Sequence, residues 1–233
     1  MGYAAVVLAG GAGSRLGGAA KPVLPVGGRP MLHRVLAAVA DASARIVVGP
    51  PALPLPEGVR RTLEEPPGSG PVAATAAGLA LVGPDPMVAL LAADLPLLTP
   101  LAIRRLRTAA GRAGVDGALF VDESGHPQWL CGVWRTGALR AALAHLVDSS
   151  GSAARPPYAG VALRRLLGNL RAVHVRDESG GKVGDAASEG AATKRLTGDR
   201  VATGTGLTPA PWWDCDTRAD LQRAEELLHG DAG

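Results

Sequence analysis

Short apolar runs alternate along the chain with longer segments in which apolar residues recur every three or four positions. The runs are rich in Val, Ile and Leu and end at glycine, proline or a polar residue, which is typical of buried parallel strands. The longer segments have the spacing of helices that pack on a sheet. We predict strands at 3–9, 44–50, 58–65, 86–94 and 171–175, and two more within 114–134 that are joined by the turn DESGHP. We predict helices at 30–42, 70–82, 97–110, 137–147, 160–170 and 216–228.

This order predicts an α/β fold of three layers, in which helices cover both faces of a mostly parallel, Rossmann-like central sheet. We expect residues 1–233 to form a single domain, a size that buries a core without disulfides. Three predicted helices have start signals: Pro71 in a first turn, Thr99 as a cap before Pro100, and Thr217 with Asp220 as a capping box.

The periodic pattern stops between residues 176 and 209. This segment is rich in Gly, Ser, Thr and charged residues and has no apolar periodicity. Such composition cannot bury enough apolar surface to order the chain. We therefore expect a flexible insertion that is dispensable for folding.

The first predicted strand ends in LAGGAGSRLGGAAKP. Glycines let the backbone approach an anion closely, and successive amide groups form an anion-binding nest. Arg15 and Lys21 frame this loop, and Lys21 is the sole lysine of the first 181 residues. The loop lacks the Gly-Lys-Ser/Thr of a P-loop, and no acid follows the second strand as a dinucleotide fold requires. The pattern favours a polyphosphate site of another type.

Asp94 follows a run of seven apolar residues, MVALLAA, at the expected carboxyl end of a central strand. Ligands in open α/β sheets bind at that edge. Thr99 already serves as cap for the next helix, so Asp94 is left to bind a metal such as Mg²⁺. Trp129 and Trp134 lie five residues apart on a predicted strand, so we expect them to face opposite sides, in the core or along a pocket for a flat ligand.

Composition excludes several classes of function. Apolar residues make up 47% of the chain but aromatic residues only 3%, so Ala, Val and Leu must form the core. The net charge of +3 is scattered without interleaved aromatic residues, which argues against nucleic-acid binding. Neither a signal peptide nor a membrane-length apolar run is present, so we expect a cytoplasmic protein without membrane contact. The five histidines and two cysteines have no zinc, triad or disulfide spacing.

The glycine-rich stretch resembles the signature of nucleotidyltransferases that act on sugars and cofactors. EEPPGSGPVAATAAGL, LLAADLPLL and WWDCDTRADL resemble three further elements of that superfamily, with Arg218 in place of a proline. Together with PQWLCGVW, they are most similar to the molybdenum-cofactor guanylyltransferase family. The resemblance covers most of residues 3–175 and 210–229.

The resemblance implies transfer of GMP from GTP to the phosphate of the molybdopterin cofactor, with release of pyrophosphate. It implies catalytic roles for Arg15, Lys21 and Asp94, and Mg²⁺, or Mn²⁺ in its place, on Asp94 and Asp216. Members of the family often carry Asn in the element that contains Asp214 and Asp216. Asp214 therefore remains an alternative to Asp216 as the second metal ligand. Glu65 would accept hydrogen bonds from guanine. The implied nucleotide-binding residues are Leu8, Ala9, Gly10, Gly11, Gly13, Ser14, Lys21, Glu65 and Asp94.

Other functions remain open at this point. The chain could be the cytidylyltransferase for the same cofactor, a guanylyltransferase of phospholactate type, or a catalytically silent nucleotide-binding module. A dehydrogenase is disfavoured by the missing ribose acid. The expected partners are GTP, a molybdopterin-type acceptor, and other cofactor-biosynthesis or apo-molybdoenzyme proteins.

Overall fold

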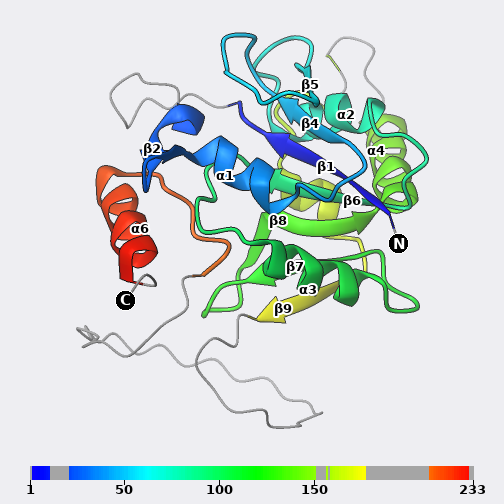
Figure 1. Cartoon of the computed structure of the whole chain (residues 1–233). Helices are drawn as coiled ribbons and strands as arrows, with labels where there is room; N and C mark the ends of the chain where they lie inside the picture. The colour runs from blue at the N-terminus through cyan, green and yellow to red at the C-terminus, as the bar shows by residue number, and fades with distance from the viewer. Residues whose placement is uncertain (1, 11–20, 151–155, 157, 177–209, 231–233) are drawn as a thin grey trace, which may run out of the picture.

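A computed structural model describes residues 2–10, 21–150, 156, 158–176 and 210–230. Within these residues, seven strands form one sheet in the order β5-β4-β1-β6-β8-β7-β9 (Figure 1). Strand β8 runs antiparallel to both of its neighbours, and the other pairs are parallel. The mostly parallel sheet predicted from the sequence is confirmed. The strands are β1 (Tyr3–Leu8), β4 (Arg45–Val48), β5 (Val59–Thr62), β6 (Met87–Ala92), β7 (Gly117–Val121), β8 (Pro127–Arg135) and β9 (Ala172–Arg176).

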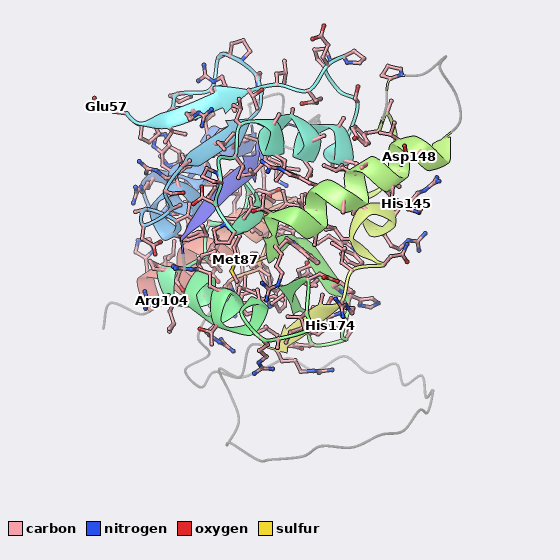
Figure 2. All side chains as sticks on the ribbon, turned by 90° about the vertical axis from the view of Figure 1, so that its right-hand side faces the viewer. Glu57, Met87, Arg104, His145, Asp148 and His174 are labelled. Carbon is pink, nitrogen blue, oxygen red and sulfur yellow. The ribbon has the colours of Figure 1, made fainter. Side chains whose placement is uncertain are left out.

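Helices cover both faces of the sheet, as the three-layer prediction required. Helices α1 (Met31–Ala38) and α3 (Pro100–Ala110) pack on one face. Helices α2 (Pro71–Ala80), α4 (Thr136–Ser150) and α5 (Leu163–Leu167) pack on the other. In Figure 2, Arg104 of α3 and His145 of α4 lie on opposite sides of the sheet.

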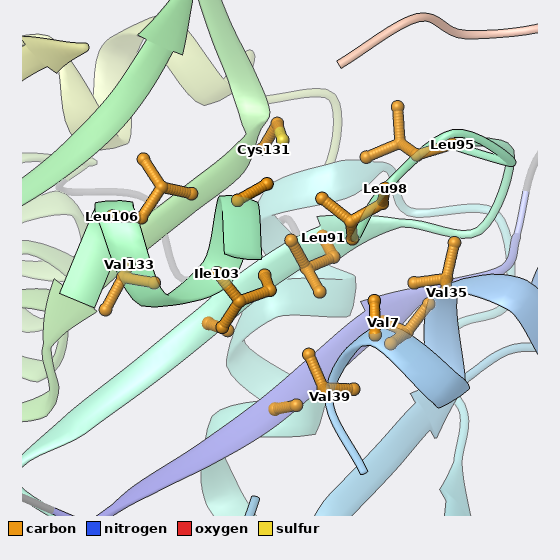
Figure 3. Close-up of a cluster of buried hydrophobic side chains, with 14 of the residues drawn as sticks. Val7, Val35, Val39, Leu91, Leu95, Leu98, Ile103, Leu106, Cys131 and Val133 are labelled. Atoms are coloured by element: carbon orange, nitrogen blue, oxygen red, sulfur yellow. The ribbon is translucent and has the colours of Figure 1, made fainter. Parts of the chain in front are cut away.

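Strand β1 explains why the predicted strands read as continuous apolar runs. Its alternate residues point to opposite faces, so Val7 joins the core under α1 and α3, while Val6 joins the core under α2. All six residues of the strand are buried. Figure 3 shows the first core, where Val7 lies near Leu91 of β6 and Ile103 of α3.

Helix α2 packs against the sheet at Gly78, where there is no room for a side chain. A Cβ atom on Gly78 would come within 2.4 Å of Val6 and 3.0 Å of Val48, so any larger residue would collide with β1 and β4. The helix begins at Pro71, as predicted, after Gly70, whose φ of 99° favours glycine.

The predicted helix caps are also present. The Thr99 hydroxyl accepts a hydrogen bond from the amide of Ala102, at 3.2 Å. At the start of α6 (Arg218–Gly230), the Thr217 amide donates to the Asp220 carboxylate at 2.7 Å, and the Asp220 amide donates back to the Thr217 hydroxyl at 3.2 Å. Both caps supply partners for amides that a helix leaves unpaired.

A small hairpin and helix α6 (Arg218–Gly230) form a third region of packing, and the sequence pattern did not indicate this contact. The 3-10 helix η2 (Lys21–Val23) precedes strands β2 (Pro25–Val26) and β3 (Arg29–Pro30), which pair around Gly27 and Gly28. Helix α6 packs beside β2 (Figure 1). The buried residues of this cluster are Val26, Met31, Leu97, Cys215 and Ala224. Segments from near both ends of the chain therefore meet at one place.

Two predictions need correction. Trp129 and Trp134 both pack toward the core under α2 and α4, so the prediction that they face opposite sides is wrong. The pairing of β7 with β8 shifts register between Leu119 and Val121, and a bulge of this kind breaks the alternation of side chains. Helix α5 is also shorter than predicted, because Gly160 turns back with a φ of 72° and donates a hydrogen bond to the Ser69 carbonyl.

Other predictions fall on segments that the structure leaves undescribed. Apart from Arg176, which ends β9, the expected insertion at 176–209 lies outside the described residues. Of the helices that are described, none is long and apolar enough to cross a membrane.

Candidate active site

Lys21, Asp94 and Asp216 meet at the edge of the sheet where the parallel strands end. The ammonium nitrogen of Lys21 is 2.5 Å from Asp94 Oδ2 and 2.5 Å from Asp216 Oδ1. The side chains of Lys21 and Asp94 are only 15% and 21% exposed, whereas that of Asp216 is 57% exposed. The three residues form a partly buried cluster with one positive and two negative charges.

Each member of this cluster is held by a different part of the fold. Asp94 follows β6, whose end is fixed to β1 by a hydrogen bond from the Ala93 amide to the Leu8 carbonyl, at 3.0 Å. Lys21 begins η2, and its carbonyl accepts from the Leu24 amide. Asp216 lies between buried Cys215 and the α6 cap. The packing of α6 on the hairpin therefore brings together residues 195 positions apart in the chain.

The local charges change the pKa values of two groups. Burial alone would lower the pKa of Lys21, but hydrogen bonds and attraction to Asp216 and Asp94 outweigh it, so its pKa is raised and the ammonium is charged at neutral pH. The pKa of Asp214 is raised by partial burial of its carboxyl and by repulsion from Asp216 and Asp94. Both pKa shifts arise in part from the carboxylates that gather at this point.

The cluster has the chemistry of a divalent-cation site that is shared with a substrate. Mg²⁺ is commonly held by one or two carboxylates together with substrate phosphates and water. Asp94 and Asp216 converge on one point and provide two carboxylates of this kind. Within the described part of the chain, no group of three or more His, Cys, Asp or Glu side chains forms a complete metal cage. The donors present therefore fit Mg²⁺ better than a metal that needs a full set of protein ligands.

The predicted phosphate-binding loop is described only at its two ends. Leu8 and Ala9 are buried at the end of β1, the Ala9 amide donates to the Val48 carbonyl at 2.8 Å, and Gly10 is exposed. Gly11, Gly13, Ser14 and Arg15 lie outside the described residues, so their assignments stay predictions.

The two neighbouring acids after β5 have different surroundings. Glu65, the predicted base-reading residue, is exposed. Glu64 is only 7% exposed, and its Oε1 accepts a hydrogen bond from the Gly68 amide at 3.0 Å. Its Oε2 is buried without a partner in the described structure. Sequence reasoning singled out Glu65 and missed the loop-anchoring contact of Glu64, which no spacing signal separates from its neighbour.

The structure brings together three of the predicted site residues, but their direct ion pairs were not predicted. The sequence assigns Lys21 to a phosphate, and Asp94 and Asp216 to a metal. In the sequence these residues are an isolated lysine and two carboxylates far apart along the chain. Nothing in that pattern predicts that they contact one another. Asp214, the alternative second ligand, lies two residues from Asp216.

Comparisons with known proteins identify the family of the chain. Residues 5–173 match the family model of the MobA-like NTP transferase domain. A molybdenum cofactor guanylyltransferase from Acidiphilium cryptum (strain JF-5) is 34% identical over 183 residues, which cover 75% of this chain and 84% of that protein.

Solved structures share the fold at lower identity. Molybdopterin-guanine dinucleotide biosynthesis protein A from Archaeoglobus fulgidus has a TM-score of 0.63 and 18% identity, and the match covers 97% of this chain and 99% of the other. The 2-C-methyl-D-erythritol 4-phosphate cytidylyltransferase from Thermus thermophilus has a TM-score of 0.58 and 22% identity, over 98% and 100% of the two chains. Similarity at this level shows the fold alone, and the two neighbours are named for different nucleotides.

Proposed function

Because the chain belongs to the MobA-like NTP transferase family and is a nucleotidyltransferase, we propose that it transfers GMP from GTP to a molybdopterin-type acceptor. The name of the 34% identical relative supports guanylyl transfer over the cytidylyl alternative. The observation that carries the proposal is that Lys21, Asp94 and Asp216 meet at the strand ends. Lys21 directly follows the glycine-rich stretch in the sequence.

In the proposed reaction, a phosphate oxygen of the acceptor attacks the α-phosphorus of GTP. A new P–O bond forms, the bond from the α-phosphorus to the bridging oxygen breaks, and pyrophosphate leaves. Such a transfer requires alignment of the reacting groups and neutralisation of phosphate charge more than covalent help. The proposed role of Lys21 is to follow the charge that develops on the α-phosphate. Arg15 is proposed to bind the β- or γ-phosphate.

We assign Asp94 and Asp216 to a divalent cation, with Mg²⁺ as the natural ion and Mn²⁺ as a substitute. When bound, this cation would neutralise the phosphate oxygens during the transfer. Asp216 is favoured over Asp214 as the second ligand because its carboxylate already reaches the same point as that of Asp94. Leu8, Ala9 and Gly10 would lie along the base and ribose, and Gly11, Gly13 and Ser14 around the phosphates.

Pyrophosphate release from GTP, with molybdopterin as acceptor, tests the proposal. Lys21→Ala should lower kcat by about 10²–10³, the size expected for loss of a positioned charge. Asp94→Asn should lose activity together with its dependence on Mg²⁺. Asp148→Asn, which changes an exposed carboxylate on α4, is the matched control and should behave as wild type. Near-wild-type turnover of Lys21→Ala or Asp94→Asn would place the active site elsewhere.

The same assay with CTP and ATP tests the choice of base. If Glu65 accepts the N1 and N2 donors of guanine, Glu65→Gln should reduce the preference for GTP by about 5- to 150-fold. Glu64→Gln is the control variant for the preference between GTP, CTP and ATP, because the Glu64 carboxylate accepts a hydrogen bond within its own loop. Preference of the wild-type chain for CTP would instead support the cytidylyltransferase.

A further inference from the structure

Lys21 lies between the two carboxylates that the proposed function assigns to a metal ion. Its nitrogen is 2.5 Å from an oxygen of each, so those oxygens lie no more than twice that distance apart. Mg²⁺ binds carboxylate oxygens at about 2.0–2.1 Å. The same two carboxylate oxygens can contact either an ammonium group or a metal ion, so the two cations compete for them.

We propose that Lys21 is a built-in counter-cation that keeps the metal from binding until a nucleotide is present. This inference rests on the proposed function, because nucleotide phosphates are what offer Lys21 another partner. The ammonium is a point charge on a flexible four-carbon chain and can turn from the carboxylates to a phosphate. The oxygens of Asp94 and Asp216 that the ammonium had contacted then become available to the metal.

The contact of Lys21 with Asp94 and Asp216 joins segments that are distant in the sequence. Asp94 and Asp216 carry like charges and would repel each other without the ammonium between them. Lys21 is largely shielded from water, so salt screens this interaction less than it screens an exposed pair. In the nucleotide-free chain, the ammonium therefore holds the segment before α6, which carries Asp216, near the end of β6, which precedes Asp94.

The consequence is an order of binding that can be measured without turnover. Free metal should bind the nucleotide-free chain weakly, because it must displace Lys21. Lys21→Met keeps the length of the side chain and removes its charge, so it should bind free Mn²⁺ at least about tenfold more tightly than wild type. Lys21→Arg keeps the charge and should bind Mn²⁺ as weakly as wild type.

The experiment is a titration of the full-length, nucleotide-free chain with Mn²⁺, in which electron paramagnetic resonance measures free Mn²⁺. The double variant Lys21→Met/Asp94→Asn should lose the gained affinity, which places the gained ion at this site. Circular dichroism checks that each variant is folded, and Lys21→Gln replaces Lys21→Met if the latter does not fold. Equal affinities of wild type and the uncharged variant would overturn the proposal.

The wild-type chain gives an independent measurement. Mn²⁺ that binds it equally tightly with and without bound nucleotide would overturn the proposal, whereas weak binding without nucleotide supports it. Turnover separates this inference from the proposed function. If the wild-type chain transfers no GMP from GTP but Lys21→Met gains the tenfold affinity for Mn²⁺, only the proposed function is contradicted. If the wild-type chain transfers GMP fully but binds Mn²⁺ as tightly as Lys21→Met does, only this inference is contradicted.

Discussion

Tyr3 lies at the start of β1 with its ring buried and its hydroxyl donating a hydrogen bond to Asp41. The Arg107 guanidinium lies 4.2 Å from the centre of the Tyr3 ring and donates to Asp41 at 2.8 Å. The hydrogen bond from Tyr3 is the main reason that the pKa of Asp41 lies below its ordinary value of 3.8. A carboxyl with a lowered pKa stabilises the fold above that ordinary value, and this stabilisation is lost as the pH falls through the lowered pKa.

We therefore predict that Tyr3→Phe lowers the free energy of unfolding by about 1 kcal/mol at pH 7. The difference from wild type should shrink when the pH is lowered below 3.8, because the protonated carboxyl is the weaker acceptor. Urea denaturation at both pH values measures the effect. Tyr158→Phe is the control: Tyr158 has no hydroxyl hydrogen bond in the described structure, so its variant should show no such pH dependence. A Tyr3→Phe effect that is unchanged in acid would contradict the argument.

At the scale of single elements, the distance between α2 and the sheet depends on Gly78. Its missing Cβ leaves room for Val6 and Val48, which belong to two adjacent strands. Helix α2 also carries the loop of Glu64 and Glu65 at its amino-terminal end, so a shift of the helix would move that loop.

We predict that Gly78→Ala destabilises the chain by about 1–3 kcal/mol, because an extra methyl group must push the helix from the sheet. Gly137→Ala is the matched control, since Gly137 lies in α4 with open space around it. That change should be neutral or stabilise the chain by up to about 1 kcal/mol, as alanine favours a helix. The midpoint of urea unfolding should fall for Gly78→Ala and should stay the same or rise for Gly137→Ala. Similar midpoints of the two variants would show that α2 is free to adjust.

The elements that were predicted and those that were missed differ in length and pairing. Strands β1 and β6 were found because burial on both faces leaves a continuous apolar run. The hairpin of β2 and β3 was missed because its strands of two residues are too short for any periodicity. Its signal was the pair Gly27-Gly28, which forms the turn with positive φ at both residues.

At the scale of the whole molecule, the candidate site combines local and distant information. Asp94 could be predicted because it ends a strand, and Lys21 because it stands alone beside a glycine-rich loop. The contact of Lys21 with Asp216 could not, since it depends on how α6 packs against the hairpin. Nothing in either local pattern encodes that packing.

The segment between Arg176 and Ala210 gives a prediction at the same scale. Because its sequence lacks apolar periodicity, we predict that a Gly-Ser linker in place of residues 177–209 leaves the Tm within a few degrees of wild type. Differential scanning calorimetry of the two chains measures this. A linker of the native length is the control for loop closure. Loss of soluble expression with both linkers would show that the segment contributes to the fold.

The ion pair between Lys21 and Asp216 also has a consequence for protein synthesis. The two residues are 195 positions apart, and a ribosome takes about 10–40 s to translate that distance. During this time the growing chain already contains the glycine-rich loop, Lys21 and then Asp94, but lacks the carboxylate before α6. A chain released early by a premature stop codon would lack it permanently. The three-residue cluster is therefore completed only after residue 216 has been translated, so chains that stop before it cannot assemble it.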